Sequence, residues 1–214
     1  MYLTKTPRFV RSLFPNFTWQ VPTKDKRVFL TFDDGPIPEV TPWVLETLDR
    51  YEAKATFFCV GENVQKYPEV FQQVLDHGHL VGNHTFNHLS GWQTENIPYF
   101  HNVRRTASLV HSELFRPPYG RLKPRQAQFL QRHYRIVMWD VLSGDFDPTI
   151  SAERCYQNVI QNIEPGSIIV FHDSLKSQDK LTDVLPRTLQ WLTDNGYAME
   201  SIPPVGQPAL VQIA

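Results

Sequence analysis

Two adjacent aspartates, Asp33 and Asp34, come near the end of the stretch RVFLTFDDGP at residues 27–36. Acidic residues are poor strand formers and Gly35 and Pro36 favour a turn, so the pair can simply begin one. The pair can also do chemistry, because one carboxylate can bind a metal ion while the other accepts a proton from a metal-bound water. Taken alone, the stretch favours the turn.

Two histidines, His84 and His88, lie four residues apart in NHTFNH. If they open a helix, both imidazoles lie on one face and can bind one ion. The chain has 8 histidines, so two surface histidines at this spacing are the plainer interpretation. A carboxylate from Asp33 or Asp34 would complete a site that leaves metal positions open for water and substrate. Such an ion lowers the pKa of its water and polarises a carbonyl.

Arg116 precedes two prolines and an aromatic residue in FRPPYG. Pro117 favours an extended conformation at Arg116, which fits a rigid turn that exposes an arginine. It equally fits a guanidinium that hydrogen-bonds a catalytic carboxylate and fixes its orientation. In the same loop, the backbone N–H of Tyr119 can stabilise a developing oxyanion.

His172 ends the apolar run IIVFHD. It can cap the following loop, or it can act as a general acid, because imidazole titrates near neutral pH. A nearby carboxylate would keep it protonated, and Asp145 in LSGDFD is the candidate.

Strands and helices must alternate to position these residues. Apolar, β-rich runs occur at 27–34, 55–61, 79–85, 113–120, 135–141, 167–173 and 197–202, and stretches with helical periodicity separate them. The pattern predicts about seven βα units, with parallel strands and outer helices. So many short units favour a small or incomplete (β/α) barrel over an open doubly wound sheet. No glycine-rich nucleotide-binding pattern follows any strand.

In such a barrel the C-terminal ends of the strands meet on one face, where active sites are built. Polar residues follow five of the predicted strands: Asp33 and Asp34, Asn83 and His84, Arg116, Asp140 and Asp145, and His172 and Asp173. We therefore expect these side chains to converge. This convergence favours chemistry over a simple turn at Asp33–Asp34 and predicts a metallohydrolase.

Composition limits the classes of protein to which the chain can belong. The 214 residues are 41% hydrophobic, which is enough for a substantial core, and the formal net charge of -1 gives no argument for nucleic acid. The longest apolar run, SIIVF, is far too short to span a bilayer. Two cysteines, Cys59 and Cys155, do not make a disulfide framework.

Residues 1–26 are predicted to be an irregular extension laid against the barrel and covering its N-terminal end. Prolines and arginines at positions 7, 8, 11 and 15 interrupt any signal-peptide apolar region. We therefore expect a cytoplasmic protein, or one from which a leader has been removed. The catalytic domain is predicted to span residues 27–214.

Five ordered segments resemble the polysaccharide deacetylase family, the NodB-homology domain of carbohydrate esterase family 4. They read TFDDGP (31–36), HTFNH (84–88), RPPYG (116–120), GDF (144–146) and VFH (170–172). The resemblance covers about residues 27–202 and implies a distorted (β/α)7 barrel. It also implies a bound divalent ion, usually zinc, with cobalt or other divalent ions accepted.

The resemblance implies a role for each matching residue. Asp33 is expected to be the catalytic base. The metal ligands are expected to be Asp34, His84 and His88. Arg116 is expected to orient Asp33, and the Tyr119 N–H to hold the oxyanion. His172 is expected to be the general acid, with Asp145 as its tuning partner, through Arg116 or directly.

The expected reaction is metal-dependent hydrolysis of the N-acetyl group of an N-acetylglucosamine-containing saccharide, with peptidoglycan, chitin or an oligosaccharide as substrate. An O-acetyl esterase acting on xylan or another acetylated sugar, and a catalytically silent carbohydrate-binding relative, remain open. The chain departs from the family pattern at Leu142 and Phe146, where an acid and a tryptophan are usual, and at Val170, where leucine is usual. These departures concern how the sugar is held.

Overall fold

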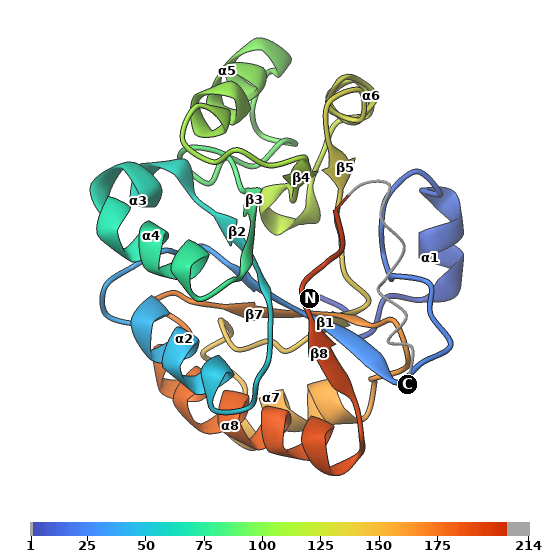
Figure 1. Cartoon of the computed structure of the whole chain (residues 1–214). Helices are drawn as coiled ribbons and strands as arrows, with labels where there is room; N and C mark the ends of the chain where they lie inside the picture. Colours follow the sequence, from blue (N-terminus) through green and yellow to red (C-terminus); the bar gives the residue numbers. More distant parts are fainter. Residues whose placement is uncertain (1, 205–214) are drawn as a thin grey trace.

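The computed structural model describes residues 2–204, so residues 205–214 of the predicted catalytic domain lie outside the described part. The chain folds into one curved sheet of parallel strands with helices around it (Figure 1). The predicted distorted (β/α)7 barrel is confirmed in an incomplete form, a half-barrel whose two edge strands do not pair with each other within residues 2–204.

The strands lie in the order β5-β4-β3-β2-β1-β7-β6, and β8 pairs with β1 off this path. Their bounds are β1 Arg27–Asp33, β2 Thr56–Cys59, β3 Leu80–Asn83, β4 Leu114–Phe115, β5 Arg135–Ile136, β6 Val141–Leu142, β7 Ile168–His172 and β8 Ala198–Glu200. Each of the seven runs predicted to be a strand contains one. The prediction of a single strand at 135–141 is wrong, because β5 pairs with β4 and β6 pairs with β7 at the opposite edge.

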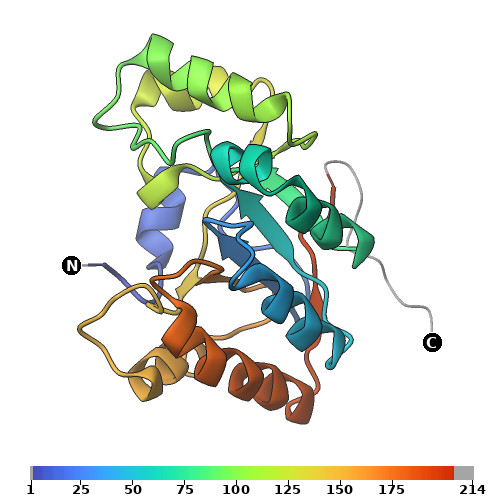
Figure 2. The same cartoon turned by 90° about the vertical axis from the view of Figure 1, so that its left-hand side faces the viewer.

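The helices cover the outside of the sheet, and both views place α2, α7 and α8 on one side of it and α5 and α6 at its other end (Figures 1 and 2). Their bounds are α1 Arg8–Leu13, α2 Thr41–Asp49, α3 Gly61–Lys66, α4 Pro68–Asp76, α5 Asn96–Ala107, α6 Pro124–Leu130, α7 Ala152–Ile160 and α8 Gln178–Asp194. The first turn and a half of α8 come from the polar run QDKLTD, which shows no helical apolar periodicity in the sequence. In the described part, no helix has the length and apolar character needed to cross a membrane.

The centre of the core is β1, whose seven residues are all buried. Its side chains meet apolar partners from both neighbouring strands: the ring of Phe32 stacks on Phe57 at 5.0 Å and on Phe171 at 5.9 Å. Parallel strands covered on both faces are expected to be apolar throughout, which is why the sequence shows β1 as a continuous run and not as an alternating one. A rigid central strand then ends at the acids Asp33 and Asp34.

The N-terminal segment, residues 2–26, lies along the gap between the two sheet edges. Thr18 bridges Val137, just after β5, and Lys5 bridges Val141 of β6. The segment includes the short helix α1 and ends near the start of β7, where Gln20 bridges Ser167. It covers the N-terminal end of the barrel only in part, since its first residues reach the C-terminal face. Unpaired strand edges need such cover.

Asp140 ties this segment to the sheet, so the prediction that it lies at the C-terminal face is wrong. The carboxylate is fully buried near the start of β7, where it accepts hydrogen bonds from the Ile168 N–H at 2.8 Å and the Ser167 hydroxyl at 3.0 Å. From the N-terminal segment, Lys5 and Gln20 donate to the same carboxylate at 2.8 and 2.7 Å. Asp140 therefore has a structural role, in which it joins the N-terminal segment to the start of β7.

We expect Asp140→Ala to destabilise the protein by about 2–6 kcal/mol, because it leaves the buried Ile168 N–H and Ser167 hydroxyl without their acceptor. Lys5 loses one carboxylate partner but keeps its contact with Glu164. Urea unfolding measures this loss.

Asp25→Ala is the matched control: Asp25 is exposed, and Arg27, its partner, keeps a second carboxylate in Glu200, so the change should cost no more than about 1 kcal/mol. Equal losses in the two variants would contradict the assigned role of Asp140.

Candidate active site

The acids after β1 and the histidine at the end of β7 lie level with one another. Asp33 is the register partner of His172 in the β1–β7 ladder and of Phe58 in the β1–β2 ladder. On the far side of β2, Asn83 at the end of β3 is level with Phe115 of β4. The parallel ladders therefore bring the residues after four strands to one face, as the sequence predicts.

Asp33 is held by Arg116. The Arg116 side chain is fully buried, and its Nη1 donates to Asp33 Oδ1 at 2.6 Å and to the Thr31 hydroxyl at 2.8 Å. Its Nε and Nη2 donate to the carbonyl oxygens of Val137 and Met138, and the guanidinium lies 4.1 Å over the ring of Phe58. Arg116 is thus not an exposed arginine on a turn. It orients the Asp33 carboxylate, which itself is only 4% exposed.

Asp34 faces the two histidines. Its Oδ1 lies 3.1 Å from His88 Nε2 and 3.7 Å from His84 Nε2. Burial by itself would raise the pKa of Asp34, but the contact with His88 and the charges of His172, His88 and His84 lower it well below the usual range. Asp34 has a left-handed backbone, with φ 84°, and the Asn63 side chain donates to its carbonyl at 2.8 Å. This backbone turns the second acid toward the histidines.

The HTFNH segment is a loop, so the expectation that His84 and His88 share a helix face is wrong. Thr85 and His88 both have left-handed backbones, with φ of 63° and 54°. Side chains replace the missing helical hydrogen bonds: Asn83 Oδ1 accepts from the Thr85 N–H, and the Thr85 hydroxyl accepts from the Leu89 N–H. The loop still brings the two imidazoles together, with ring centres 5.0 Å apart.

The orientation of His84 is fixed by the backbone of Arg116. His84 Nδ1 lies 2.8 Å from the Arg116 carbonyl oxygen, which can only accept, so Nδ1 carries the proton. Nε2 is then left with a lone pair directed toward Asp34. Burial lowers the pKa of His84 to about 4, which keeps the ring neutral. A neutral imidazole whose other nitrogen donates to a carbonyl is the usual form of a metal-bound histidine.

These three residues fit a divalent metal ion. One ligand atom from each of Asp34, His84 and His88 lies within 4.8 Å of the others, and no other group of three or more such residues occurs in residues 2–204. Asp34 Oδ1 is buried and accepts no well-oriented hydrogen bond, as expected of an atom reserved for an ion. Two imidazoles and one carboxylate suit zinc and related ions.

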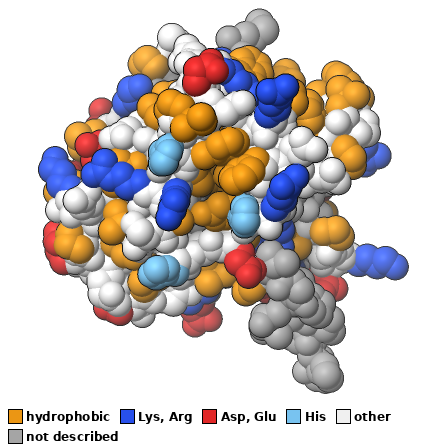
Figure 3. Space-filling model, turned by 90° about the horizontal axis from the view of Figure 1, so that it is seen from above, with side chains coloured by type: hydrophobic (Ala, Val, Ile, Leu, Met, Phe, Trp, Pro, Cys, Tyr) orange, Lys and Arg blue, Asp and Glu red, His pale blue; other side chains and the backbone are white. Residues whose placement is uncertain are grey.

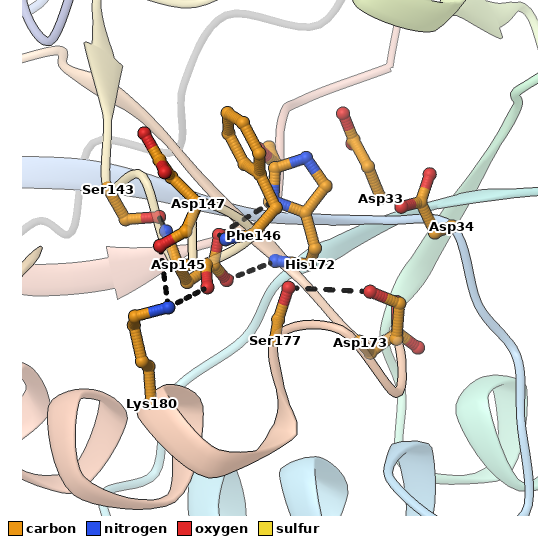
Figure 4. A network of polar contacts seen from close by, with 12 residues as sticks. Asp33, Asp34, Ser143, Asp145, Phe146, Asp147, His172, Asp173, Ser177 and Lys180 are labelled. Carbon is orange, nitrogen blue, oxygen red and sulfur yellow. Dashed lines mark hydrogen bonds and ion pairs between the residues drawn. The ribbon is translucent and has the colours of Figure 1, made fainter. Parts of the chain in front are cut away.

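His172 lies between Asp145 on one side and the Asp33–Asp34 pair on the other (Figure 4). The two oxygens of Asp145 contact His172 Nδ1 at 2.8 Å and its backbone N–H at 2.7 Å. Burial would lower the pKa of His172, but the charge and hydrogen bond of Asp145, together with Asp34 and Asp33, raise it to about 9. Asp145 therefore acts on His172 directly and not through Arg116.

A pocket of about 420 Å³ opens over these residues. Tyr119 lines it, 61% exposed, with its ring edge-on to His88 at 4.7 Å. The Pro118–Gly120 turn is closed by the N–H groups of Gly120 and Arg121, which donate to Pro117 and Pro118, so the Tyr119 N–H takes part in neither bond. The three positions that depart from the family pattern also line the pocket: Leu142, Phe146 and Val170.

Asp173 is a supporting residue to which the sequence assigned no role. It is fully buried, and its carboxylate accepts from the Gly35 N–H at 3.1 Å and from the Thr41 hydroxyl at 2.6 Å. A Cβ on Gly35 would come within 1.9 Å of Asp173 Oδ2, so this close approach requires glycine. Asp173 thus holds the turn that directs Asp34. A buried acid directly after His172 was the available signal.

A second cavity, of about 550 Å³, lies between α5 and α6. It is apolar, with Ile97, Phe100 and Phe129 in its lining, and His101 and His133 lie at its edge. Figure 3 shows this side of the molecule, where apolar side chains gather between histidines and basic residues. No third ligand accompanies its histidines in the described part, so the smaller pocket is the candidate active site.

The fold and the Asp34–His84–His88 cluster define a (β/α)-barrel protein with a candidate metal site at the C-terminal ends of its strands, and sequence comparison identifies the family. The sequence model of the family named polysaccharide deacetylase matches residues 20–134. The chain belongs to this family.

Two peptidoglycan-N-acetylglucosamine deacetylases of Bacillus cereus are similar to the chain. One is 33% identical over 86% of this chain and 90% of the relative. The other is 32% identical over 80% of this chain, which spans 66% of that relative. A chitooligosaccharide deacetylase of Azorhizobium caulinodans is 35% identical over 68% of this chain and 73% of its own length.

A solved structure gives the same fold. It is a peptidoglycan N-acetylglucosamine deacetylase in complex with 4-naphthalen-1-yl-N-oxidanyl-benzamide. The TM-score is 0.84 at 30% sequence identity, over 92% of this chain and 95% of that one.

Loss of a residue that only hydrogen-bonds a metal ligand typically weakens metal binding roughly 10–100-fold. Because His84 would itself be a ligand, we expect His84→Ala to weaken zinc binding by more than this. Isothermal titration with zinc at neutral pH measures the affinity. His101→Ala, an exposed histidine at the edge of the second cavity, is the control and should leave the affinity unchanged. Equal zinc affinity for His84→Ala and the unaltered protein would exclude the proposed cluster.

The pKa of His172 predicts a pH-dependent stability. Because its folded-state pKa of about 9 lies above the ordinary value of 6.5, protonated His172 contributes stability fully below about pH 6.5. That contribution is lost as the pH rises through 9. In metal-free protein, the stability advantage of wild type over His172→Gln in urea unfolding should therefore shrink from pH 6 to pH 9.5.

The matched control removes the charge partner. In an Asp145→Asn background the same His172→Gln comparison should vary much less with pH, because Asp145 is the strongest of the charges that raise the pKa of His172. An advantage that grows with pH in the wild-type background would refute the assigned ion pair.

Proposed function

We propose that the protein is a zinc-dependent deacetylase that hydrolyses the N-acetyl group of an N-acetylglucosamine-containing saccharide and releases acetate. One observation carries the proposal: Asp33, oriented by buried Arg116, lines the same pocket as the Asp34–His84–His88 cluster and as His172, which Asp145 contacts from behind. This arrangement offers a base, a metal site and an acid around one space. The relatives named as peptidoglycan-N-acetylglucosamine and chitooligosaccharide deacetylases support the substrate class.

In this proposal Asp34, His84 and His88 would hold the ion, which when bound would polarise the carbonyl and make the attacking water more acidic. Asp33 takes the proton of the attacking water, because Arg116 donates to its Oδ1 and fixes the orientation of the carboxylate. The backbone N–H of Tyr119 is assigned to the carbonyl oxygen as negative charge develops there.

His172 is assigned as the general acid. A departing amine must gain a proton when the C–N bond breaks, and Asp145 keeps His172 in its protonated form at neutral pH. An ester needs this proton less, because an alcohol is a better leaving group than an amine. The protonated histidine therefore favours N-deacetylation over the O-acetyl esterase alternative. The presence of Asp33 and all three ligands argues against a catalytically silent relative.

Acetate release from chitopentaose and from peptidoglycan, with added zinc and with a chelator, tests the proposal. We expect zinc-dependent release, and we expect Asp33→Asn to lower kcat by about 10²–10⁴-fold while zinc content stays the same. Asp194→Asn, an exposed acid at the end of α8, is the matched control and should keep the wild-type rate.

Three outcomes would contradict parts of this proposal. Near-full turnover by Asp33→Asn would refute the base assignment. Release only from acetylated xylan would identify an O-acetyl esterase. No acetate from any acetylated saccharide, with zinc bound, would identify a silent binding relative.

A further inference from the structure

We propose that Tyr2, from the N-terminal segment, forms a binding wall with Phe146 for the saccharide beside the reacting N-acetyl group, and is therefore a substrate-positioning residue. This inference rests on the proposed saccharide substrate. Tyr2 lies outside residues 20–134, which match the family, and far in sequence from every motif that marks the site. The tertiary structure alone brings it there.

Tyr2 lines the catalytic pocket together with Asp33, Asp34 and His172. The backbone pairing of the N-terminal segment with β6 places it: the Leu142 N–H donates to the Thr4 carbonyl at 2.9 Å, and Lys5 bridges Val141. Residue 2 then stands beside the loop that follows β6. Because β6 ends at the C-terminal face, the same pairing that closes the barrel gap brings an aromatic side chain to the pocket.

The hydroxyl of Tyr2 is occupied by the protein. It donates to Asp147 Oδ2 at 2.9 Å, while the other oxygen of Asp147 holds the turn at Thr149. Burial, the hydrogen bond to Asp147 and its charge raise the pKa of Tyr2, so the phenol stays protonated. Tyr2 is therefore not an acid or base of the reaction. What it offers the pocket is its ring.

The ring continues a row of aromatic side chains that starts at the general acid. Phe146 is edge-on to His172 at 5.0 Å, and Tyr2 lies 5.2 Å from Phe146. A pyranose ring has faces of C–H groups that pack well against aromatic rings, while its hydroxyls stay in water. With the departing nitrogen of the sugar at His172, the sugar or its neighbour in the chain would lie along this row.

Gly144 makes room for this arrangement. A Cβ on Gly144 would come within 2.7 Å of the Tyr2 hydroxyl, and the residue has a left-handed backbone with φ 81°. The glycine in LSGDFD thus lets the N-terminal segment approach the loop that carries Asp145 and Phe146. The absence of a side chain at Gly144 thus allows the close contact between this loop and Tyr2.

The test compares Tyr2→Ala with Tyr2→Phe, using chitopentaose as the probe. We expect Tyr2→Ala to raise KM for deacetylation about tenfold, with a smaller fall in kcat, because it removes an aromatic contact to bound sugar. Tyr2→Phe keeps the ring and should restore KM to nearly the wild-type value. Activity on 4-nitrophenyl acetate, which carries no sugar, should fall much less than activity on chitopentaose.

Binding to an Asp33→Asn background, measured by isothermal titration, separates this inference from the proposed function. There, Tyr2→Ala should raise the Kd of chitopentaose by about the same factor, whether or not the wild type releases acetate. Phe9→Ala is the matched control: Phe9 is an aromatic of the same segment, 67% exposed and outside the pocket lining, and its loss should change neither KM nor Kd.

Unchanged KM and Kd in Tyr2→Ala would overturn the inference while leaving the deacetylase proposal intact. Equal weakening by Tyr2→Phe would also overturn it, because the hydrogen bond to Asp147 and not the ring would then matter. If the wild type releases no acetate but Tyr2→Ala still weakens binding, the deacetylase proposal fails and the binding wall stands. If chitopentaose does not bind at all, the inference fails, and acetate release from peptidoglycan alone then decides the deacetylase proposal.

Discussion

The buried guanidinium of Arg116 is the constraint on which the rest of the site depends. A charge taken fully out of water must be paired and hydrogen-bonded, and Asp33 supplies the pair while Thr31 and two backbone carbonyls accept three further hydrogen bonds. The carbonyl of the same residue accepts from His84. One residue therefore orients both a carboxylate that can act as a base and an imidazole that can bind a metal ion.

The surroundings of His84 and His172 shift the pKa values of these two histidines in opposite directions. Burial dominates at His84, whose pKa falls to about 4, so its ring is neutral and suited to an ion. At His172 the carboxylate of Asp145 outweighs burial, and the pKa rises to about 9. Separated pKa values in one pocket are how a single fold supplies both a ligand and an acid at neutral pH.

The incomplete barrel gives the N-terminal segment its importance. A half-barrel leaves two strand edges open, and residues 2–26 fill the gap with Lys5 and Gln20 fastened to buried Asp140. The N-terminal segment covers the gap between the two sheet edges at Asp140, and its first residues bring Tyr2 to the pocket. Fold closure and the shape of the pocket are therefore set by the same pairing.

The sequence by itself determined the alternation of strands and helices, because apolar runs and turn residues mark each element within its own segment. That alternation in turn predicts the convergence of Asp33, Asp34, His84, Arg116 and His172. The tertiary structure decided that residues 135–141 contribute to opposite edges and that HTFNH is a loop. It also decided that Asp140 lies away from the site, that Asp173 holds the turn after β1, and that Tyr2 lines the pocket. Such positions depend on pairing between residues that are distant in the chain, and local periodicity does not predict that pairing.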